Sequence, residues 1–224
     1  MFEIDSKQKE IVLFSGGRDS TLTASLLMMK NIPLILFGGN SGSSVKSHFT
    51  YIRVKELRKK FGNLVTDYYV EDISGSFRKI ALENIESDIL KYKKNLVVLG
   101  EKIALHTHVV NFCIRHGIKK ISDGLTFYQK DLPDQREVTI RLLKKFMKKY
   151  GIEYESPIYS SSKTVEDVKY KLMQLGLSTK PIEGSTIFGD TFTYASDEIV
   201  EEYMLSKETL AHEIVEFLTQ KKFD

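Results

Sequence analysis

A short apolar run meets a glycine-rich turn near the start of the chain. The stretch VLFSGGRDSTLTASLL, residues 12–27, passes through Ser-Gly-Gly at 15–17 and continues into a helix-like pattern over 19–30. Glycines there let backbone N–H groups approach an anion closely, and the first turn of a helix favours negative charge. We therefore predict a phosphate-binding turn between a buried strand and a helix. Its candidate cofactor-binding residues are Ser15, Gly16, Gly17, Arg18, Asp19, Ser20 and Thr21.

Strand-like apolar runs alternate with helical stretches along the rest of the chain. We expect strands at 11–14, 33–37, 63–70, 96–99 and 118–122, and helices at 19–30, 45–61, 77–93, 102–116 and 135–150. This alternation predicts an α/β fold, a parallel doubly wound sheet of about five strands with helices on both faces. Ligands of such sheets bind beyond the C-terminal ends of the strands. The stretch GGNSGSS after the second strand predicts a mobile loop.

Composition limits the class of protein. The 224 residues show no repeat or linker, which predicts one domain over 1–224 with a C-terminal helical extension at 192–224. The net charge of +3 is too small to argue for nucleic-acid binding by itself. A lone cysteine, Cys113, excludes an intramolecular disulfide and a multi-cysteine metal site. The polar N-terminus and the lack of an apolar run near 20 residues predict a cytoplasmic protein without a membrane span.

The string Ser-Gly-Gly-x-Asp-Ser at 15–20 resembles the PP-loop of the N-type ATP pyrophosphatases, also called adenine nucleotide alpha hydrolases. It lacks the Gly-Lys-Ser/Thr ending of the Walker A pattern. The resemblance implies the fold of that family, with ATP and Mg²⁺ as cofactors. It also implies cleavage of ATP between the α and β phosphates: a carbonyl or carboxylate oxygen of the substrate is adenylated, the loop holds the departing pyrophosphate, and a nucleophile displaces AMP. Asp19 and Ser20 would be catalytic, with Asp19 as a ligand of Mg²⁺.

Later segments resemble, in matching order, 7-cyano-7-deazaguanine synthase, an enzyme of queuosine biosynthesis. They are SSVKSHFTYIRVKELRKKFG, SDGLTFYQKDLPDQREV and PIYSSSKTVEDVKYKLMQLG. The resemblance implies substrate contacts from His48, Asp123, Asp134 and Arg136, a catalytic Lys163, nucleotide contacts from Phe37, Gly38 and Gly124, and closure of the loop at 38–47 over ATP. Two departures stand out. Glu101 and Lys102 replace the usual Arg-Asn, and the four zinc cysteines are missing, so no zinc is expected.

Three functions stay open at this point. The first is a ligase that adenylates a small substrate and then joins it to ammonia or an amine. The second is a tRNA-thiolating enzyme that takes sulfur from a partner protein, with the lysines of the helix at 135–150 facing RNA. The third is an adenylate-binding module without turnover, against which the intact motif argues. We favour the ligase over the sulfurtransferase, and we read the lysines, His106 and His108 as surface and packing residues. Homodimerisation is expected only by analogy with relatives.

Overall fold

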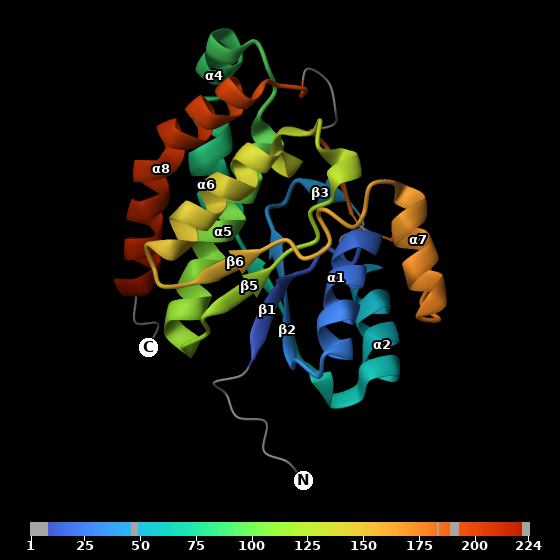
Figure 1. Ribbon diagram of the computed structural model, residues 1–224. Coiled ribbons are helices and arrows are strands. Elements are labelled where there is room, and N and C mark those ends of the chain that lie inside the picture. The colour runs from blue at the N-terminus through green and yellow to red at the C-terminus, as the bar shows by residue number, and fades with distance from the viewer. Residues whose placement is uncertain (1–8, 46–48, 183, 189–192, 221–224) are drawn as a thin grey trace.

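The computed structural model describes residues 9–45, 49–182, 184–188 and 193–220 (Figure 1). Five parallel strands form the central sheet in the order β4-β2-β1-β5-β6. They are β1 Glu10–Leu13, β2 Leu34–Asn40, β4 Val65–Asp72, β5 Lys120–Ser122 and β6 Glu153–Glu155. β2 and β4 lie on one side of β1, and β5 and β6 lie on the other. The strand order therefore switches direction at β1. The predicted fold class is confirmed.

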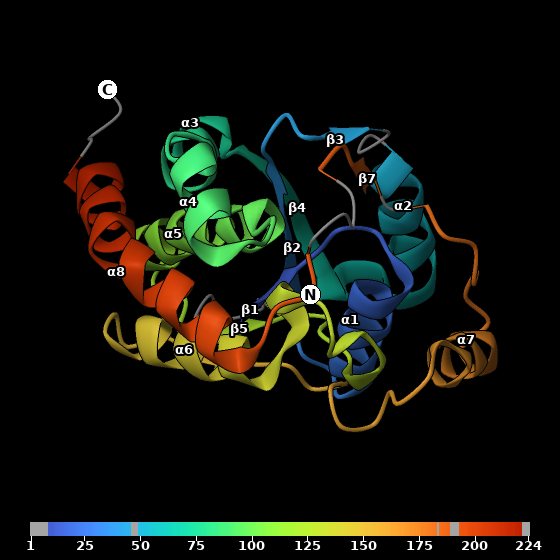
Figure 2. The ribbon, with the colours of Figure 1, turned by 90° about the horizontal axis from the view of Figure 1, so that it is seen from above.

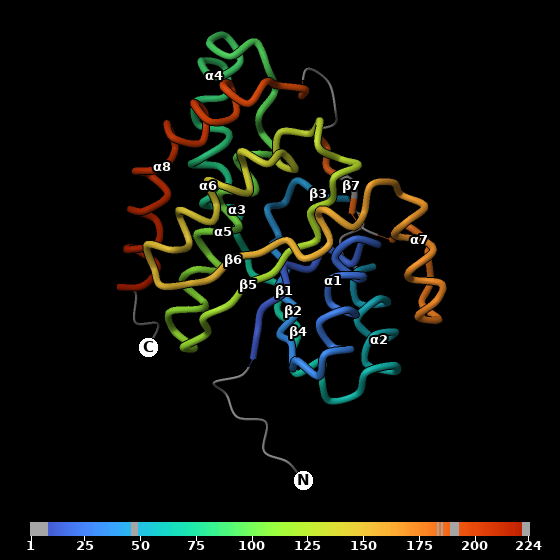
Figure 3. The backbone as a smooth tube through the Cα atoms, viewed as in Figure 1, coloured from blue at the N-terminus to red at the C-terminus, as the bar shows by residue number. Residues whose placement is uncertain are grey.

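Helices cover both faces of this sheet (Figures 1 and 2). One face carries α1 Arg18–Met29, α2 Thr50–Phe61 and α7 Val165–Gln174. The other carries α3 Ser74–Phe77, α4 Ile85–Tyr92, α5 Val97–His116, α6 Glu137–Lys148 and α8 Asp197–Gln220. The backbone trace in Figure 3 shows α7 beside α1, although about 140 residues separate them in the sequence.

The alternation of β1 explains why both faces are covered. Ile11 and Leu13 belong to the buried cluster under α5, α6 and α8, whereas Val12 and Phe14 belong to the cluster under α1, α2 and α7. Each fully buried side chain of this size stabilises the fold by roughly 1.5–3 kcal/mol relative to an exposed one. A strand with apolar residues on both faces can be stable only in the interior of a sheet that is covered on both sides.

One strand prediction was wrong, and one strand was missed. Residues 97–99 are the first of α5 and Leu96 directly precedes them; at this helix start the side chain of Asn95 accepts a hydrogen bond from Val97 N at 3.1 Å. A short apolar run cannot be assigned to strand or helix by its pattern alone. The fifth strand is instead β6, three residues of which only Tyr154 is buried, too short to be recognised in the sequence.

The region after β2 also differs from the prediction. Gly38, Gly39 and Asn40 extend β2, so the expected mobile loop is partly strand. The helix expected from 45 begins at Thr50, and Ser44–Val45 forms β3, which pairs antiparallel with β7, Ser185–Thr186. The helix expected at 77–93 is divided into the end of α3, a π-helical turn at Arg78–Leu82 and α4. The C-terminal region contains a single helix of 24 residues, α8.

One helix has the dimensions of a membrane span. By length and composition alone α5, Val97–His116, is apolar enough to cross a bilayer, which corrects the expectation that no run of this kind exists. Within this fold 67% of its most apolar 18-residue window is buried, and α5 packs against α8. The apolar character of α5 therefore suits a central core helix.

Candidate functional site

The phosphate loop, defined here as Ser15–Thr21, connects β1 to α1. Gly16 has φ +79°, and a Cβ there would lie 2.9 Å from the Cα and Cγ2 atoms of Thr50. Backbone conformation and crowding therefore both require glycine. Gly17 is extended and precedes α1, whose first N–H groups have no acceptor within the helix. The loop thus presents backbone donors at the positive end of the helix dipole.

Side chains of α2 hold the loop from behind. Thr50 Oγ1 donates to Ser15 O at 2.9 Å, and Arg53 Nε lies 3.5 Å from Gly16 O. The Arg53 guanidinium, 1% exposed, also donates to Ser178 O at 2.7 Å and to Lys180 O at 2.9 Å, and it pairs with Glu56 at 2.5 Å. The contacts of Thr50 and Arg53 hold the carbonyl groups of Ser15 and Gly16 against α2. Neither side chain was expected to take part in the site.

Hydroxyl groups complete the loop. Ser15 Oγ and Ser20 Oγ are 3.2 Å apart, and both side chains border the cleft. Thr21 is fully buried and its Oγ1 donates to Gly17 O at 2.6 Å, so this hydroxyl is used within the loop itself. Ser15 and Ser20 are consequently the hydroxyls of the loop that can meet a ligand.

Gly124, after β5, packs directly beneath the start of α1. A Cβ at this position would lie 2.5 Å from Ser20 N and 2.8 Å from the carbonyl carbon of Asp19. Gly38 is less crowded, with the nearest contact at 3.2 Å to Phe14 O. The segment after β5 therefore approaches the loop this closely because Gly124 lacks a side chain.

A cleft of about 640 Å³ opens at the C-terminal ends of the strands. It brings together most of the residues predicted to bind nucleotide or substrate. Those that line it are Ser15, Gly17, Asp19, Ser20, Phe37, Gly38, Asp123 and Gly124. Gly16, Arg18, Thr21, Asp134, Arg136 and Lys163 do not line it, and His48 lies outside the described residues.

Asp19 enters the cleft from the first turn of α1. Tyr128, in the 3₁₀ turn Phe127–Gln129, donates its hydroxyl to both carboxylate oxygens, at 3.0 and 2.8 Å. Burial and the adjacent Asp19 charge raise the pKa of Tyr128, so it remains a donor. Mg²⁺ is commonly held by one or two carboxylates together with phosphate oxygens. Asp19 fits that requirement, and the described residues contain no cluster of three or more metal-ligating side chains.

Another wall of the cleft is formed by α5 and the turn before α6. Glu101 Oε1 accepts hydrogen bonds from Ser41 and from Ser43, the latter at 3.0 Å. Lys102 Nζ lies 3.9 Å from both Asp123 Oδ2 and Asp134 Oδ2, and its side chain is 13% exposed. Gln135 Nε2 donates to Asp134 Oδ2 at 2.8 Å. Asp134 therefore contributes to this wall by contacting Lys102 and Gln135.

Asp123 lies at the floor of the cleft with its carboxylate already engaged. It accepts hydrogen bonds from Tyr154 OH, from Ser156 Oγ at 2.6 Å and from Leu125 N at 3.3 Å. A buried carboxylate with these partners holds β5, β6 and the following turn together. The predicted substrate role of Asp123 remains a prediction.

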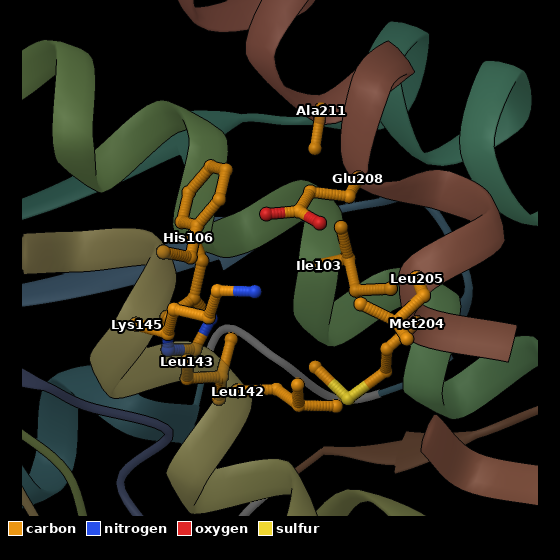
Figure 4. Close-up of a pocket in the computed structure, with 10 residues that line it drawn as sticks. Ile103, His106, Leu142, Leu143, Lys145, Met204, Leu205, Glu208 and Ala211 are labelled. Atoms are coloured by element: carbon orange, nitrogen blue, oxygen red, sulfur yellow. The ribbon is translucent and has the colours of Figure 1, made fainter. Parts of the chain in front are cut away.

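His106 borders the same cleft from α5. It is completely buried, and burial, reinforced by Lys102, lowers its pKa to about 3. Its Nδ1 lies 2.7 Å from Lys102 O, and its Nε2 is buried without a partner. His106 also borders a small, mostly apolar pocket of about 30 Å³ between α5, α6 and α8 (Figure 4). That space admits about one water-sized molecule.

Several candidate residues lie elsewhere. Arg136 pairs with Asp197 at the start of α8, 2.5 Å away. Lys163 is exposed before α7, and its backbone N–H donates to Asp167 at 2.9 Å as part of the helix cap. Cys113 is buried, and burial raises the pKa of its thiol to about 12.

The basic face of α6 is partly neutralised. Arg141 pairs with Glu201 at 3.0 Å and Lys149 with Glu208 at 2.7 Å, both acids belonging to α8. These pairs reduce the positive charge that an RNA backbone would meet there.

One feature of the sequence could have indicated that α2 contributes to the site. The buried stripe of α2 consists of Thr50, Arg53, Val54 and Leu57, spaced as an apolar stripe would be. Two polar residues at core positions of a helix indicate a specific buried partner. Tyr128, Glu101 and Lys102 carry no comparable local pattern.

Comparisons with known proteins agree on the fold. The sequence matches no protein-family profile. It is 28% identical over 152 residues to a "Probable tRNA sulfurtransferase" of Saccharolobus islandicus, a match covering 67% of this chain and 36% of that protein. The chain thus spans about a third of the length of the curated relatives it matches.

Solved structures extend this likeness. NMN synthetase from Francisella tularensis superposes with a TM-score of 0.52 and 12% identity, over 97% of this chain and 86% of that one. A structure named "predicted subunit of tRNA methyltransferase", from Methanocaldococcus jannaschii, gives a TM-score of 0.44 at 21% identity, over 76% of this chain and 90% of that one. The chain has the adenine nucleotide alpha hydrolase-like fold.

Proposed function

We propose that this protein cleaves ATP between the α and β phosphates and transfers AMP to an oxygen of a second substrate. The observation that carries the proposal is the phosphate loop itself, at the end of the central strand and closed from below by Gly124. Its fixed donors are aimed into a cleft large enough for a nucleotide and a second molecule. The match to the sulfurtransferase and the fold of NMN synthetase support the same chemistry.

The loop would act on the leaving group. Negative charge grows on the β-phosphate as the α,β bond breaks, and donors already in place stabilise that charge without reorganising. The N–H groups of the first turn of α1 and the hydroxyls of Ser15 and Ser20 are those donors. Asp19 would hold Mg²⁺, which supplies charge neutralisation on the phosphates when bound.

The strand next to β1, β2, would hold the nucleoside. Phe37 and Gly38 line the cleft beside the loop, and Phe37 O accepts a hydrogen bond from Phe14 N at 2.7 Å, which fixes the backbone there. Backbone groups at this edge would meet adenine. The second substrate would then occupy the wall formed by Glu101, Lys102 and Gln135.

We favour a ligase that forms a C–N bond, in the manner expected from the likeness to 7-cyano-7-deazaguanine synthase. A tRNA-thiolating enzyme is the second candidate, because the curated relatives carry that name. In that case sulfur would have to come from a partner, since Cys113 is buried and its pKa is raised to about 12.

The test is the product pattern from ATP labelled in the α-phosphate, which follows AMP, and in a parallel sample in the γ-phosphate, which follows pyrophosphate. We expect AMP and pyrophosphate when a small-molecule extract is supplied, and neither product from Asp19→Ala or Ser20→Ala protein that melts at the wild-type temperature. Formation with tRNA alone would favour thiolation. ADP and inorganic phosphate as products would overturn the proposal.

A further inference from the structure

A serine, a histidine and a glutamate meet where α3 and α5 approach the end of β4. Ser76 Oγ lies 2.8 Å from His108 Nε2, and His108 Nδ1 lies 3.6 Å from Glu71 Oε1. Each comes from a different element: Glu71 from the end of β4, Ser76 from α3 and His108 from the middle of α5. None of the three lines the cleft. The cluster is therefore separate from the site described above.

The two ring nitrogens of His108 have different roles. A carboxylate can only accept, so Nδ1, the nitrogen beside Glu71, carries the proton of the neutral ring. Nε2 is then an acceptor, and the hydrogen bond runs from the Ser76 hydroxyl to the imidazole. Burial lowers the pKa of His108, and the charge of Glu71 opposes this decrease. The ring is therefore mainly neutral at neutral pH and can take a proton from Ser76.

This order of contacts is that of a serine nucleophile with its general base and an orienting carboxylate. The distance from Nδ1 to Glu71 is longer than a hydrogen bond, and among the described residues the buried Nδ1 has no hydrogen-bond partner. Catalytic hydrogen bonds are often long in a protein without substrate and shorten when one binds. The Glu71 side chain is 44% exposed, so it can close this gap without repacking the core.

Ser76 can be reached from solvent. Its side chain is only partly buried, and a Cβ on the neighbouring Gly75 would meet nothing within 4 Å, which indicates open space beside Ser76. His108 is buried, so water competes little for its Nε2. The hydroxyl is therefore accessible to a reagent while its base is shielded.

An aromatic surface adjoins the cluster. Alternate residues of a strand share a face, as do residues four apart on a helix, so Tyr69 lies beside Glu71 and Phe112 beside His108. The rings of Tyr69 and Phe112 are 5.0 Å apart, and Tyr69 is 41% exposed. This pair is the next contact between β4 and α5 after Glu71 and His108. It offers apolar surface to the organic part of a substrate.

We propose that Ser76, His108 and Glu71 form a second reactive centre, in which Ser76 takes an acyl group from an activated carboxylic ester. Ser76 and His108 are its catalytic residues. Glu71 is a positioning residue that acts through His108. The activity is independent of ATP and of the cleft.

The reaction step balances without a cofactor. Ser76 Oγ forms a bond to the carbonyl carbon while its proton passes to His108 Nε2. The bond from that carbon to the alcohol oxygen then breaks, and the alcohol leaves with the proton from Nε2. The products are acylated Ser76 and the free alcohol, and Glu71 stays ionised throughout.

The first test is labelling by an alkyl fluorophosphonate, in which an activated serine oxygen replaces fluoride. On the full chain without ATP we expect one label, mapped to Ser76 by mass spectrometry, and p-nitrophenyl acetate should acetylate the same residue. His108→Gln should slow labelling by about 100-fold or more, the contribution of a general base. Ser74→Ala is the matched control, since Ser74 lies in the same turn and contacts Asp72 instead. A wild-type protein without label on Ser76, or wild-type labelling of His108→Gln, would overturn the proposal.

A second variant keeps the test valid if His108→Gln fails to fold. In Ser76→Cys the thiol should form a thiolate–imidazolium pair, seen by its ultraviolet absorbance well below about pH 8.5, the usual pKa of a free thiol. Adding Glu71→Gln should move this titration to higher pH, because the imidazolium loses its carboxylate, whereas a purely structural Glu71 would leave it unchanged. Cys113 is buried with its pKa raised to about 12 and does not interfere. An ordinary thiol titration in Ser76→Cys would contradict the proposal.

Discussion

The hydroxyl of Tyr128 donates to both oxygens of the Asp19 carboxylate, at 3.0 and 2.8 Å. A single donor shared in this way orients the carboxylate. Outer partners of this kind commonly change metal affinity by about 10–100-fold when they are removed.

Tyr128→Phe should therefore raise the Mg²⁺ concentration needed for half-maximal AMP formation by about tenfold. Manganese binding followed by electron paramagnetic resonance, in the presence of α,β-methylene-ATP, should weaken in parallel. Tyr170→Phe, an exposed tyrosine on α7, is the control. An unchanged Mg²⁺ requirement would show that Tyr128 does not position Asp19.

Gly124→Ala should weaken nucleotide binding. The new methyl carbon would lie 2.5 Å from Ser20 N, so the first turn of α1 must shift and its donors must lose their alignment. Calorimetry should show ATP affinity reduced by more than about tenfold, since one lost hydrogen bond to a charged phosphate is already worth that much. Gly75→Ala, where a Cβ meets nothing within 4 Å, should bind normally.

Thr50→Val removes one hydroxyl from behind the loop while keeping the side chain's shape. We expect a loss of about 0.5–1.5 kcal/mol in the free energy of unfolding and a rise in the KM for ATP. Thr66→Val removes a similar bond, from Thr66 Oγ1 to Leu34 O at 2.8 Å within the sheet. Thr66→Val should lower the free energy of unfolding by a similar amount and leave the KM for ATP unchanged. Equal KM values in the two variants would argue that Thr50 only stabilises the fold.

His106 predicts a loss of stability in acid. Its pKa is lowered from 6.5 to about 3, so below pH 6.5 the unfolded chain binds a proton that the folded protein does not. Stability therefore falls as the pH drops from 6.5 towards 3, by roughly 5 kcal/mol for this group. The free energy of unfolding of His106→Leu, measured with urea across this range, should fall less steeply in acid than that of the wild type. His116 is exposed, so His116→Gln should follow the wild type.

Cys113→Ala should keep its turnover in every mixture that produces AMP. The thiol is buried and its pKa is raised to about 12, so little thiolate exists at neutral pH. Steady-state rates measured with tRNA and with small substrates test this. Loss of the tRNA-dependent rate, at an unchanged melting temperature, would restore a thiol mechanism.

The fold class and the phosphate loop could be predicted because both depend on local pattern. Val12 and Ile11 alternate towards two covered faces, and the glycines of the loop precede a helix in the sequence itself. Residues 96–99 were misassigned because four apolar residues suit a strand and a buried helix equally well.

The rest of the site depends on long-range contacts. Tyr128 meets Asp19 across 109 positions, and Arg53 meets Ser178 across 125. No spacing rule connects such residues, since the sheet order alone decides which loops are neighbours. Glu101 and Lys102 stood out in the sequence only as departures from the expected Arg-Asn, and their place in the cleft became visible with the structure.

The pairing of β3 with β7 has a consequence for biosynthesis. The phosphate loop leaves the ribosome before β7 does, so Ser44–Val45 beside the cleft finds its partner strand only when residues 185–186 have emerged. Arg53 likewise waits for Ser178 and Lys180. A nascent chain stalled before that point would contain the whole nucleotide motif without the supports behind it. Competence to hold ATP should therefore arise only after residues 178–186 have been synthesised.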